Sequence, residues 1–374
     1  TQNVALGQSA AAAMTTGNQN TIIGTNAGDA LTDADHNVAV GMNALTADTL
    51  GSKSTAIGTG ALGTQNFTTA TNVYNTAVGY DAGVAVTTGV NNTLIGSRAG
   101  DALTDADFNT AVGYSALTAD TLGSRSVAVG TAALQAQNFT TATDTYNTAV
   151  GFSAGLSVTT GTRNVLLGGL SGDALTTGGD NVAVGTQALS GDTKGSRSVA
   201  IGQGALYTQN FTTATNAYNI AVGFDAGVYL TTGTQNTLIG GLAGDALTDA
   251  DGNVAVGYAS LTDNVLGSNS VAIGRNALNA QNPATATDMY NVAVGNNCGE
   301  AITTGTHNTL VGGLVGDALT TGFANVAVGG GATYAALGSD TKGKFSTAIG
   351  FGALRAQNFT TETATNNTAV GYFA

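Results

Sequence analysis

A short motif of the type Asn-x-Ala-Val-Gly recurs along the whole chain and restricts its fold more than any other feature. The glycines that end the motif are spaced by 17, 17, 17 and 21 residues, and this cycle of 72 residues runs four times from Gly7 to Gly295. The next cycle is four residues longer, within the segment 329–343, and 21 such glycines occur up to Gly371. A period of about 17 residues is too short for a propeller blade or a helical repeat. We therefore predict an all-β, parallel β-solenoid of about 21 coils, here called rungs, forming a single continuous array over residues 1–374.

Each position of the motif keeps its own chemical character. The first position is Asn in sixteen rungs and Ser in the fourth rung of every cycle, and stacked Asn side chains can form hydrogen-bonded ladders. The second and fourth positions are β-branched or apolar, and the third is Ala except for one larger residue per cycle: Ile22, Leu94, Leu166, Leu238 and Leu310. Both faces of the predicted strand are thus apolar, which is typical of strands covered on both sides. Since one solenoid buries only one face, we expect a partner, most simply further copies of this chain.

A second column of small residues follows each motif. Ala27, Ala44 and Ala61 lie three residues after their motif glycines, and the residue after this Ala is Gly, Gly, Leu and Leu in the successive rungs of a cycle. We interpret this column as the inner position of a second short strand. Each rung then consists of strand, tight turn, strand and loop, with rungs about 4.8 Å apart.

The motif also resembles a known family. The segments SVAVG at 126–130 and SVAIG at 198–202 and 270–274, with the NTAVGY units, resemble the head repeats of YadA-type trimeric autotransporter adhesins and similar repeats in phage tail fibres. The resemblance covers essentially the whole chain, although the period here is longer than in those heads. It implies a left-handed β-roll, a homotrimeric rod and an extracellular location on a cell surface or a virion fibre. It also implies attachment to host surfaces.

Aromatic residues recur with the 72-residue cycle, in and after the insert QNFTTAT of the 21-residue rungs. Stacking would place them along one edge, about 19 Å apart. They either contact a ligand such as a host-surface glycan or protein, or pack against a sister chain, and both interpretations stay open. The residues concerned are Phe67, Tyr74, Phe139, Tyr146, Phe211 and Tyr218. The same two interpretations apply to the aromatic residues that directly follow motif glycines, namely Tyr80, Tyr114, Phe152, Phe224 and Tyr258.

Three loops have the Asp-x-Asp-x-Asn pattern of a calcium loop. Their carboxylates belong to Asp33, Asp35, Asp105, Asp107, Asp249 and Asp251. The equivalent loops TGGDN at 177–181 and TGFAN at 321–325 lack this pattern, so the same bend forms without it. Asp and Asn suit tight bends by themselves, and we predict solvated turns, no metal and no cofactor.

Other chemistry is sparse. Cys298 lies in the small-residue column, and we interpret it as a substitute for Ala. His36 and His307 lie in unrelated rungs without a clustered partner. We therefore expect no enzymatic activity. The net charge of −13, with only 10 scattered Lys and Arg, argues against nucleic acid. No apolar run is long enough to span a bilayer, and the first residues lack the order of a signal peptide.

Three classes of function remain. The leading hypothesis is a fibrous adhesin segment that assembles with copies of itself, side by side and also end to end, and attaches to a host or another surface. The first alternative is a structural filament or spacer without a ligand of its own. The second alternative is an ice-binding solenoid. The irregular alternation of Thr and Val in the strand (Val4, Thr21, Val38) argues against it.

Overall fold

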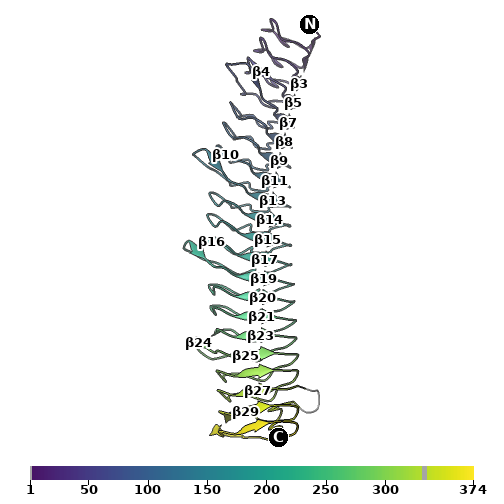
Figure 1. Cartoon of the computed structure of the whole chain (residues 1–374). Coiled ribbons are helices and arrows are strands. Elements are labelled where there is room, and N and C mark those ends of the chain that lie inside the picture. Colours follow the sequence, from purple (N-terminus) through teal and green to yellow (C-terminus); the bar gives the residue numbers. More distant parts are fainter. Residues whose placement is uncertain (1, 331–334) are drawn as a thin grey trace. The chain divides into compact units, whose positions relative to one another are not determined.

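The computed structural model describes residues 2–330 and 335–374, and these consist of short parallel strands joined by turns, without a helix. The predicted all-β, parallel β-solenoid of about 21 rungs is thereby confirmed. By their internal contacts the residues form two compact units, Thr1–Asn181 and Val182–Ala374, and each is described by itself. Within each unit successive rungs lie on one another (Figure 1). A single array across both units remains a prediction, and part of the predicted four-residue extension falls on residues 331–334, outside the described residues.

The first unit contains ten strands of three residues, one per rung, and two pairs of two-residue strands, each of which joins a 21-residue rung to the rung before it. The three-residue strands are β1 (Val4–Leu6), β2 (Thr21–Ile23), β3 (Val38–Val40), β5 (Thr55–Ile57), β7 (Thr76–Val78), β8 (Thr93–Ile95), β9 (Thr110–Val112), β11 (Val127–Val129), β13 (Thr148–Val150) and β14 (Val165–Leu167). The two-residue strands are β4 (Gly51–Ser52) with β6 (Thr71–Asn72) and β10 (Gly123–Ser124) with β12 (Thr143–Asp144).

The second unit repeats this arrangement. Its three-residue strands are β15 (Val182–Val184), β17 (Val199–Ile201), β19 (Ile220–Val222), β20 (Thr237–Ile239), β21 (Val254–Val256), β23 (Val271–Ile273), β25 (Val292–Val294), β26 (Thr309–Val311), β27 (Val326–Val328), β29 (Thr347–Ile349) and β31 (Thr368–Val370). Its two-residue pairs are β16 (Gly195–Ser196) with β18 (Thr215–Asn216), β22 (Gly267–Ser268) with β24 (Thr287–Asp288), and β28 (Gly343–Lys344) with β30 (Thr363–Ala364).

The register of the strands follows the sequence period. Thr21 of β2 pairs with Val38 of β3, and Thr55 of β5 pairs with Thr76 of β7, which reproduces the spacings of 17 and 21 residues. Equivalent residues therefore lie in columns along each unit. A residue type repeated at the period becomes a continuous row of identical side chains.

The motif glycines are required by the close approach of neighbouring rungs. Gly79 has a φ of 142°, and a Cβ atom on it would lie 2.5 Å from the carbonyl oxygen of Gly96 in the next rung. Any side chain here would force the rungs apart, since real Cβ atoms do not approach a carbonyl oxygen so closely. This explains why the last residue of the motif never changes.

The core consists of the third motif position and the small-residue column. The middle residues of the strands, such as Ala77 and Leu94, are fully buried, as is Ala82 of the small-residue column. The Gly, Gly, Leu, Leu alternation compensates for the one large strand residue per cycle. A Cβ on Gly83 would lie 2.6 Å from Cδ1 of Leu94 and 3.1 Å from Cδ2 of Leu62. Large and small side chains thus alternate so that the narrow interior is filled.

The predicted second strand at the small-residue column is wrong, although the burial of the column is as expected. Ala27 is fully buried, but it lies in a turn and not in a strand. Its neighbours Asn26 and Gly28 both have left-handed backbone conformations, with φ of 54° and 50°. Left-handed residues on both sides of Ala27 cannot continue an extended strand.

The Asn at the first motif position forms the predicted hydrogen-bonded ladder. The backbone N–H of buried Asn37 donates to Oδ1 of Asn20 (2.8 Å), and Oδ1 of Asn37 accepts from the backbone N–H of Ser54 (2.8 Å). Its Nδ2 also donates to the carbonyl oxygen of Gly51 (2.9 Å). The Asn37 side chain therefore satisfies two backbone groups of the next rung, and buried polar groups require such partners.

Each 21-residue rung adds a buried polar network around its Ser. Oδ2 of Asp48 accepts from Nε2 of Gln65 (2.6 Å), which also donates to Oγ of Ser54 (3.0 Å), while Oε1 of Gln65 accepts from Nδ2 of Asn75 (3.0 Å). Asp120, Asp192 and Asp340 accept equivalent bonds in three other cycles. In the fourth cycle Asn264 replaces the Asp, and Nε2 of Gln281 has no partner among the described residues.

Candidate binding edge

The residue directly before each motif Asn or Ser lies at a corner of the coil, and these residues form what we call the edge column. Its members adopt left-handed conformations with φ between 51° and 67°. This conformation costs a non-glycine residue roughly 1–2 kcal/mol, yet the column contains long and aromatic side chains. In the first unit these include His36, Lys53, Tyr74, Phe108, Arg125, Tyr146, Arg163 and Asp180, and in the second unit Arg197, Tyr218, Asn269, Tyr290, His307 and Phe345.

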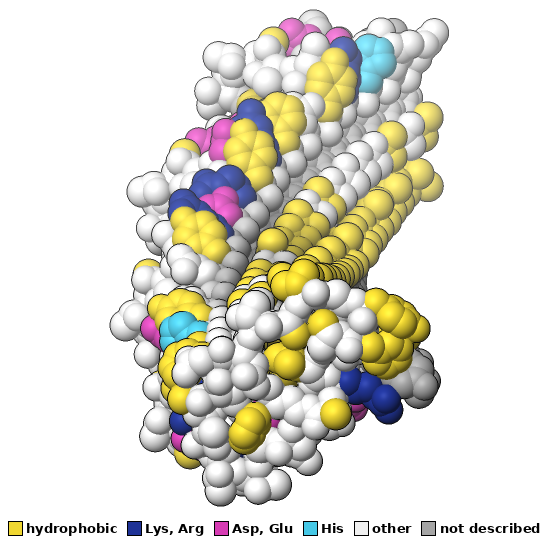
Figure 2. Space-filling view, turned by 60° about the horizontal axis from the view of Figure 1, so that its bottom comes forward, with side chains coloured by type: hydrophobic (Ala, Val, Ile, Leu, Met, Phe, Trp, Pro, Cys, Tyr) yellow, Lys and Arg dark blue, Asp and Glu magenta, His cyan; other side chains and the backbone are white. Residues whose placement is uncertain are grey.

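Cationic and aromatic members of the edge column contact each other in successive rungs. Nζ of Lys53 lies 5.2 Å from the ring centroid of Tyr74, and Cζ of Arg197 lies 5.6 Å from that of Tyr218. In the second unit, the rings of Tyr290 and His307 are 5.2 Å apart. Figure 2 shows several separate clusters of side chains. In these clusters, aromatic rings lie beside charged side chains of both signs. Charge and apolar surface are therefore combined at repeated places on the edge.

The structure separates the predicted row of aromatic residues into two groups. Tyr74, Tyr146 and Tyr218 belong to the edge column and are 47–54% exposed. Phe67, Phe139 and Phe211 are only 6–7% exposed, so they do not form one exposed row with the tyrosines. The backbone N–H of Phe67 donates to Oδ1 of buried Asp48 (3.0 Å), which draws the insert back onto the coil and buries the ring. The phenylalanines contribute packing, and ligand contact by the tyrosines stays a prediction.

The aromatic residues after the motif glycines lie on a different surface, beside the outer face of the strands. Tyr80, Tyr114, Phe152, Phe224 and Tyr258 are all exposed. The outward strand residues next to them are apolar and only partly covered, among them Ile57, Ile95 and Val150 in the first unit and Ile201, Ile239 and Ile273 in the second. We call these aromatic and strand residues together the apolar face.

The predicted calcium candidates make hydrogen bonds to the preceding rung. Oδ1 of Asp105 accepts from Oγ1 of Thr88 (2.6 Å), and Oδ1 of Asp107 accepts from the backbone N–H of Val90 (2.7 Å). Asp33, Asp35, Asp249 and Asp251 make equivalent bonds. The bonds from Thr232 and then Thr231 lower the pKa of Asp249. In the part of the chain that is described, no three His, Cys, Asp or Glu side chains are grouped so that they could hold a metal ion.

The other reactive side chains lie apart. Cys298 is fully buried in the small-residue column, as its sequence position predicts, and burial raises the pKa of its thiol to about 12. Its Sγ donates to the carbonyl oxygen of Leu310 (3.4 Å). His36 and His307 are members of the edge column in different units. In the second unit, His307 is exposed at the edge, whereas Cys298 lies in the core.

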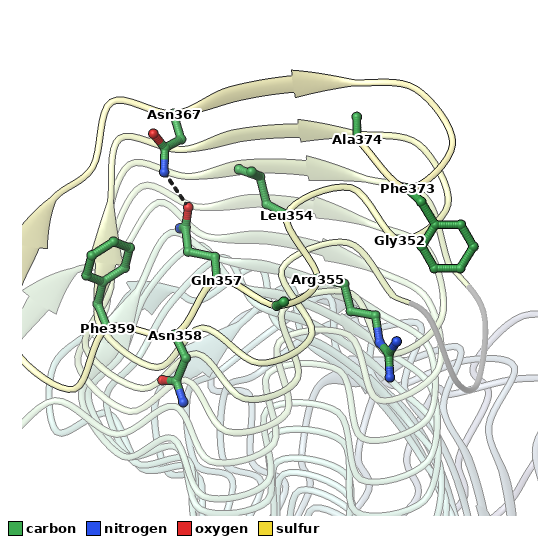
Figure 3. Close-up of a pocket in the computed structure, with 10 residues that line it drawn as sticks. Gly352, Leu354, Arg355, Gln357, Asn358, Phe359, Asn367, Phe373 and Ala374 are labelled. Carbon is green, nitrogen blue, oxygen red and sulfur yellow. Dashed lines mark hydrogen bonds between the residues drawn. The ribbon is translucent and has the colours of Figure 1, made fainter.

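The described residues form hollows at the edge of the first unit and at the last rungs of the second unit. One of about 470 Å³ lies at the edge of the first unit and is lined by Asp105, Asp107, Phe108, Ser124, Arg125 and Asp144, among others. The second, of about 500 Å³, lies at the last rungs of the second unit, where Gln357 Oε1 accepts from Nδ2 of Asn367 (Figure 3). It exposes groups whose equivalents are buried in earlier cycles, such as Asn367, the equivalent of Asn291.

Four residues of the first hollow were not predicted from the sequence: Phe108, Ser124, Arg125 and Asp144. They belong neither to the insert nor to the repeated motif, and they come from three successive rungs. Reading the single position before every motif Asn or Ser as one column would have placed Phe108, Arg125 and Tyr146 next to each other.

Comparisons with known proteins add no family to this description. No protein-family model matches the chain, and no curated protein is significantly similar to it. Among the described residues there is also no helix of the length and hydropathy needed to cross a membrane.

Proposed function

We propose that this chain is a segment of an extracellular fibrous protein on a bacterial surface or a virion fibre, and that its edge attaches the fibre to a host or another surface. The observation that carries the proposal is the contrast between core and edge across the five cycles. The motif glycines and buried columns hardly change, whereas successive cycles carry His36, Phe108, Asp180, Gly252 and Ala324 at one edge position. Variation confined to exposed positions of a constant scaffold is typical of binding surfaces.

The apolar face supports side-by-side assembly of several copies. The outward strand residues are Val, Ile, Leu or Thr in each rung, and the exposed aromatic rings lie beside them. Figure 2 shows the resulting rows of hydrophobic side chains. Soluble monomers rarely expose continuous apolar surface of this kind. We propose that sister chains cover it, with three copies as the number that the resemblance to YadA-type heads implies.

The remaining parts of the proposal follow from the net charge of the chain and from its small number of reactive side chains. Because the chain has a net charge of −13, it would repel a phosphate backbone, and we propose no role with nucleic acid. The role is structural and adhesive rather than enzymatic, and it requires no cofactor. Partners are copies of the chain and a glycan or protein of the surface to which it attaches.

The structure gives less support to an ice-binding solenoid. A column of Thr does recur in most rungs of the first unit, including Thr15, Thr32, Thr87 and Thr104. However, the Oγ1 of Thr15 donates to the carbonyl oxygen of Thr32 (3.2 Å), and that of Thr87 donates to the carbonyl oxygen of Thr104 (3.2 Å). These hydroxyl groups are therefore engaged within the coil rather than free to match a lattice.

A cell-binding experiment tests the proposal. The full chain, fluorescently labelled, is incubated with a panel of bacterial and animal cells, and the bound fraction is measured after washing. We expect saturable retention on at least one cell type, which unlabelled chain competes away. Rods seen by electron microscopy, together with no retention on any cell type, would instead support a spacer without its own ligand.

A further inference from the structure

The hollow at the edge of the first unit is built from three successive rungs. The loop before β9 contributes Asp105, Asp107 and Phe108, strand β10 and the residue after it contribute Ser124 and Arg125, and strand β12 contributes Asp144. Its volume of about 470 Å³ lies in the range of roughly 300–1,000 Å³ that is usual for small-molecule sites. The hollow combines carboxylates, a guanidinium group, a hydroxyl group and an aromatic ring.

Arg125 organises one wall of this hollow. Its Cζ lies 5.2 Å from the ring centroid of Phe108 in the preceding rung and 5.9 Å from that of Tyr146 in the following rung. The guanidinium group also forms a salt bridge with Asp144, whose other carboxylate oxygen accepts from the hydroxyl of Tyr146 (3.4 Å). Both rings remain about half exposed. The wall is therefore ordered before a ligand arrives, which reduces the entropic cost of binding.

The loop before β9 contributes hydrogen-bond acceptors to the lining of the hollow. Asp105 and Asp107 each use Oδ1 to bind the preceding rung, while neither Oδ2 has a hydrogen-bond partner among the described residues. Oγ of Ser124 accepts from the backbone N–H of Asp107 (3.0 Å) and can still donate its own proton. A ligand with several hydroxyl groups could satisfy these atoms.

The charge of the hollow restricts the ligand further. Asp105, Asp107 and Asp144 outnumber the one cation, Arg125, so the field inside is negative. Phosphorylated, sulfated and sialylated groups are repelled by such a field. A neutral pyranose fits this lining, because its C–H face can pack on aromatic rings while its hydroxyl groups donate to carboxylates.

The sister cycles show that the fold itself does not require these side chains. The equivalents of Phe108 are His36, Asp180, Gly252 and Ala324; those of Arg125 are Lys53, Arg197, Asn269 and Phe345; those of Asp144 are Asn72, Asn216, Asp288 and Ala364. All five versions form the same rungs. The requirements of folding therefore do not explain why the second cycle combines Phe108, Arg125 and Asp144.

From this geometry we propose that the hollow lined by Phe108, Arg125, Asp144, Asp105 and Asp107 binds a neutral, hexose-containing glycan. The inference rests on the proposed attachment function and names its ligand class and its site. The rings of Phe108 and Tyr146, held by Arg125, contact the sugar faces, and the Oδ2 atoms of Asp105 and Asp107 accept from sugar hydroxyls.

The test uses the intact chain and a glycan array that carries neutral, sialylated and phosphorylated oligosaccharides. We expect retention of neutral hexose-containing glycans only, and titration calorimetry with the best neutral oligosaccharide then gives its affinity. The substitutions Phe108→Gly and Arg125→Asn copy residues that the fourth cycle already holds at these positions, so they preserve the fold. Each should weaken binding at least tenfold, whereas Gln235→Asn, in the edge column but away from the hollow, should leave it unchanged.

Several outcomes would overturn the inference. These are retention of acidic glycans alone, no retention of any glycan by the folded chain, or unchanged affinity in both variants with the β-sheet circular dichroism spectrum intact. If labelled chain still binds cells in any of these cases, only the glycan inference fails, and a protein ligand takes its place. If it binds no cell either, the attachment function fails as well.

Discussion

At the scale of single residues, the ladder of buried Asn side chains joins successive rungs. Asn92 takes part in it through three kinds of contact. Its backbone N–H donates to Oδ1 of Asn75 (2.9 Å), its Nδ2 donates to the carbonyl oxygen of Ala106 (2.8 Å), and its Oδ1 accepts from the backbone N–H of Asn109 (2.9 Å). Removing this side chain therefore leaves two backbone groups of the next rung, the carbonyl oxygen of Ala106 and the N–H of Asn109, without these partners.

The substitution Asn92→Ala tests this role. Since each buried polar group left unpaired costs about 1–3 kcal/mol, the free energy of unfolding should fall by about 3 kcal/mol. The measurement is the urea midpoint followed by circular dichroism. The control is Asn91→Gly, because the side chain of Asn91 is exposed and its φ of 58° suits glycine. A loss in the control as large as in Asn92→Ala would show that the ladder is not what stabilises this rung.

Asp192 is a buried carboxyl group in the rung that precedes a 21-residue rung. Burial raises the pKa of Asp192, although hydrogen bonds from Gln209 and from the backbone of Gly195 and Phe211 oppose the shift. The folded chain therefore holds this proton at a higher pH than the unfolded chain does. Its contribution to stability is complete below the ordinary Asp pKa of about 3.9 and is lost as the pH rises through the raised value.

The comparison of the chain with its Asp192→Asn variant isolates this effect, and Asn264 shows that Asn is accommodated at the equivalent position. The unfolding free energy of the chain minus that of the variant should decrease between acidic and neutral pH. Urea titrations at several pH values measure this difference. An increase with pH would mean that the folded state prefers the ionised carboxylate and would contradict the raised pKa.

At the scale of the rung, the spacing between coils is set by the motif glycines. A Cβ on Gly151 would lie 2.5 Å from the carbonyl oxygen of Gly168, and the φ of Gly151 is 141°. We expect Gly151→Ala to lower the free energy of unfolding by about 3 kcal/mol or more, through backbone strain and overpacking.

Gly169 provides a matched control for this prediction. A Cβ there would meet nothing within 4 Å, so Gly169→Ala should change stability by no more than about 0.5 kcal/mol. Thermal unfolding of both variants, monitored by circular dichroism, measures the difference. Equal melting temperatures for the two variants would contradict the idea that rungs touch through the motif glycines.

The rung also shows what could be predicted from the sequence. The period, the strand register, the Asn ladder and the buried Ala column follow from strict repetition, because each repeated residue has to tolerate its own copy as a neighbour. The turn around Ala27 could not be recognised, because the position of Gly28 holds Leu45 and Leu62 in the next two rungs, and Leu is not typical of the left-handed conformation that these residues adopt. Likewise, the burial of Phe67 depends on its backbone bond to Asp48, nineteen residues away.

The candidate site was less accessible to sequence reasoning than the fold. Tyr146, Asp105 and Asp107 were identified as separate features, an aromatic row and a calcium-like loop. Asp105 and Asp107 line the hollow, and Tyr146 is joined to it through Arg125, which lies near the rings of both Phe108 and Tyr146. Only the stacking geometry brings these residues together.

At the scale of the whole molecule, the proposed association of several copies depends on the apolar face. Its outward strand residues and aromatic rings, among them Ile95, Tyr114 and Phe152 in the first unit, have no covering segment in the described part of the chain. Burial of apolar surface contributes roughly 25 cal/mol per Å², so a face that runs along many rungs favours association. An interface between copies would bury this face, while the polar edge column stays available for a ligand.

The most direct test of this claim is the mass of the purified chain in solution, measured by size-exclusion chromatography with light scattering. The account predicts a species of about three times the chain mass of 36.6 kDa, with the mass unchanged on dilution through the micromolar range. A β-rich chain that elutes at 36.6 kDa and remains soluble with its apolar face open to water would contradict it.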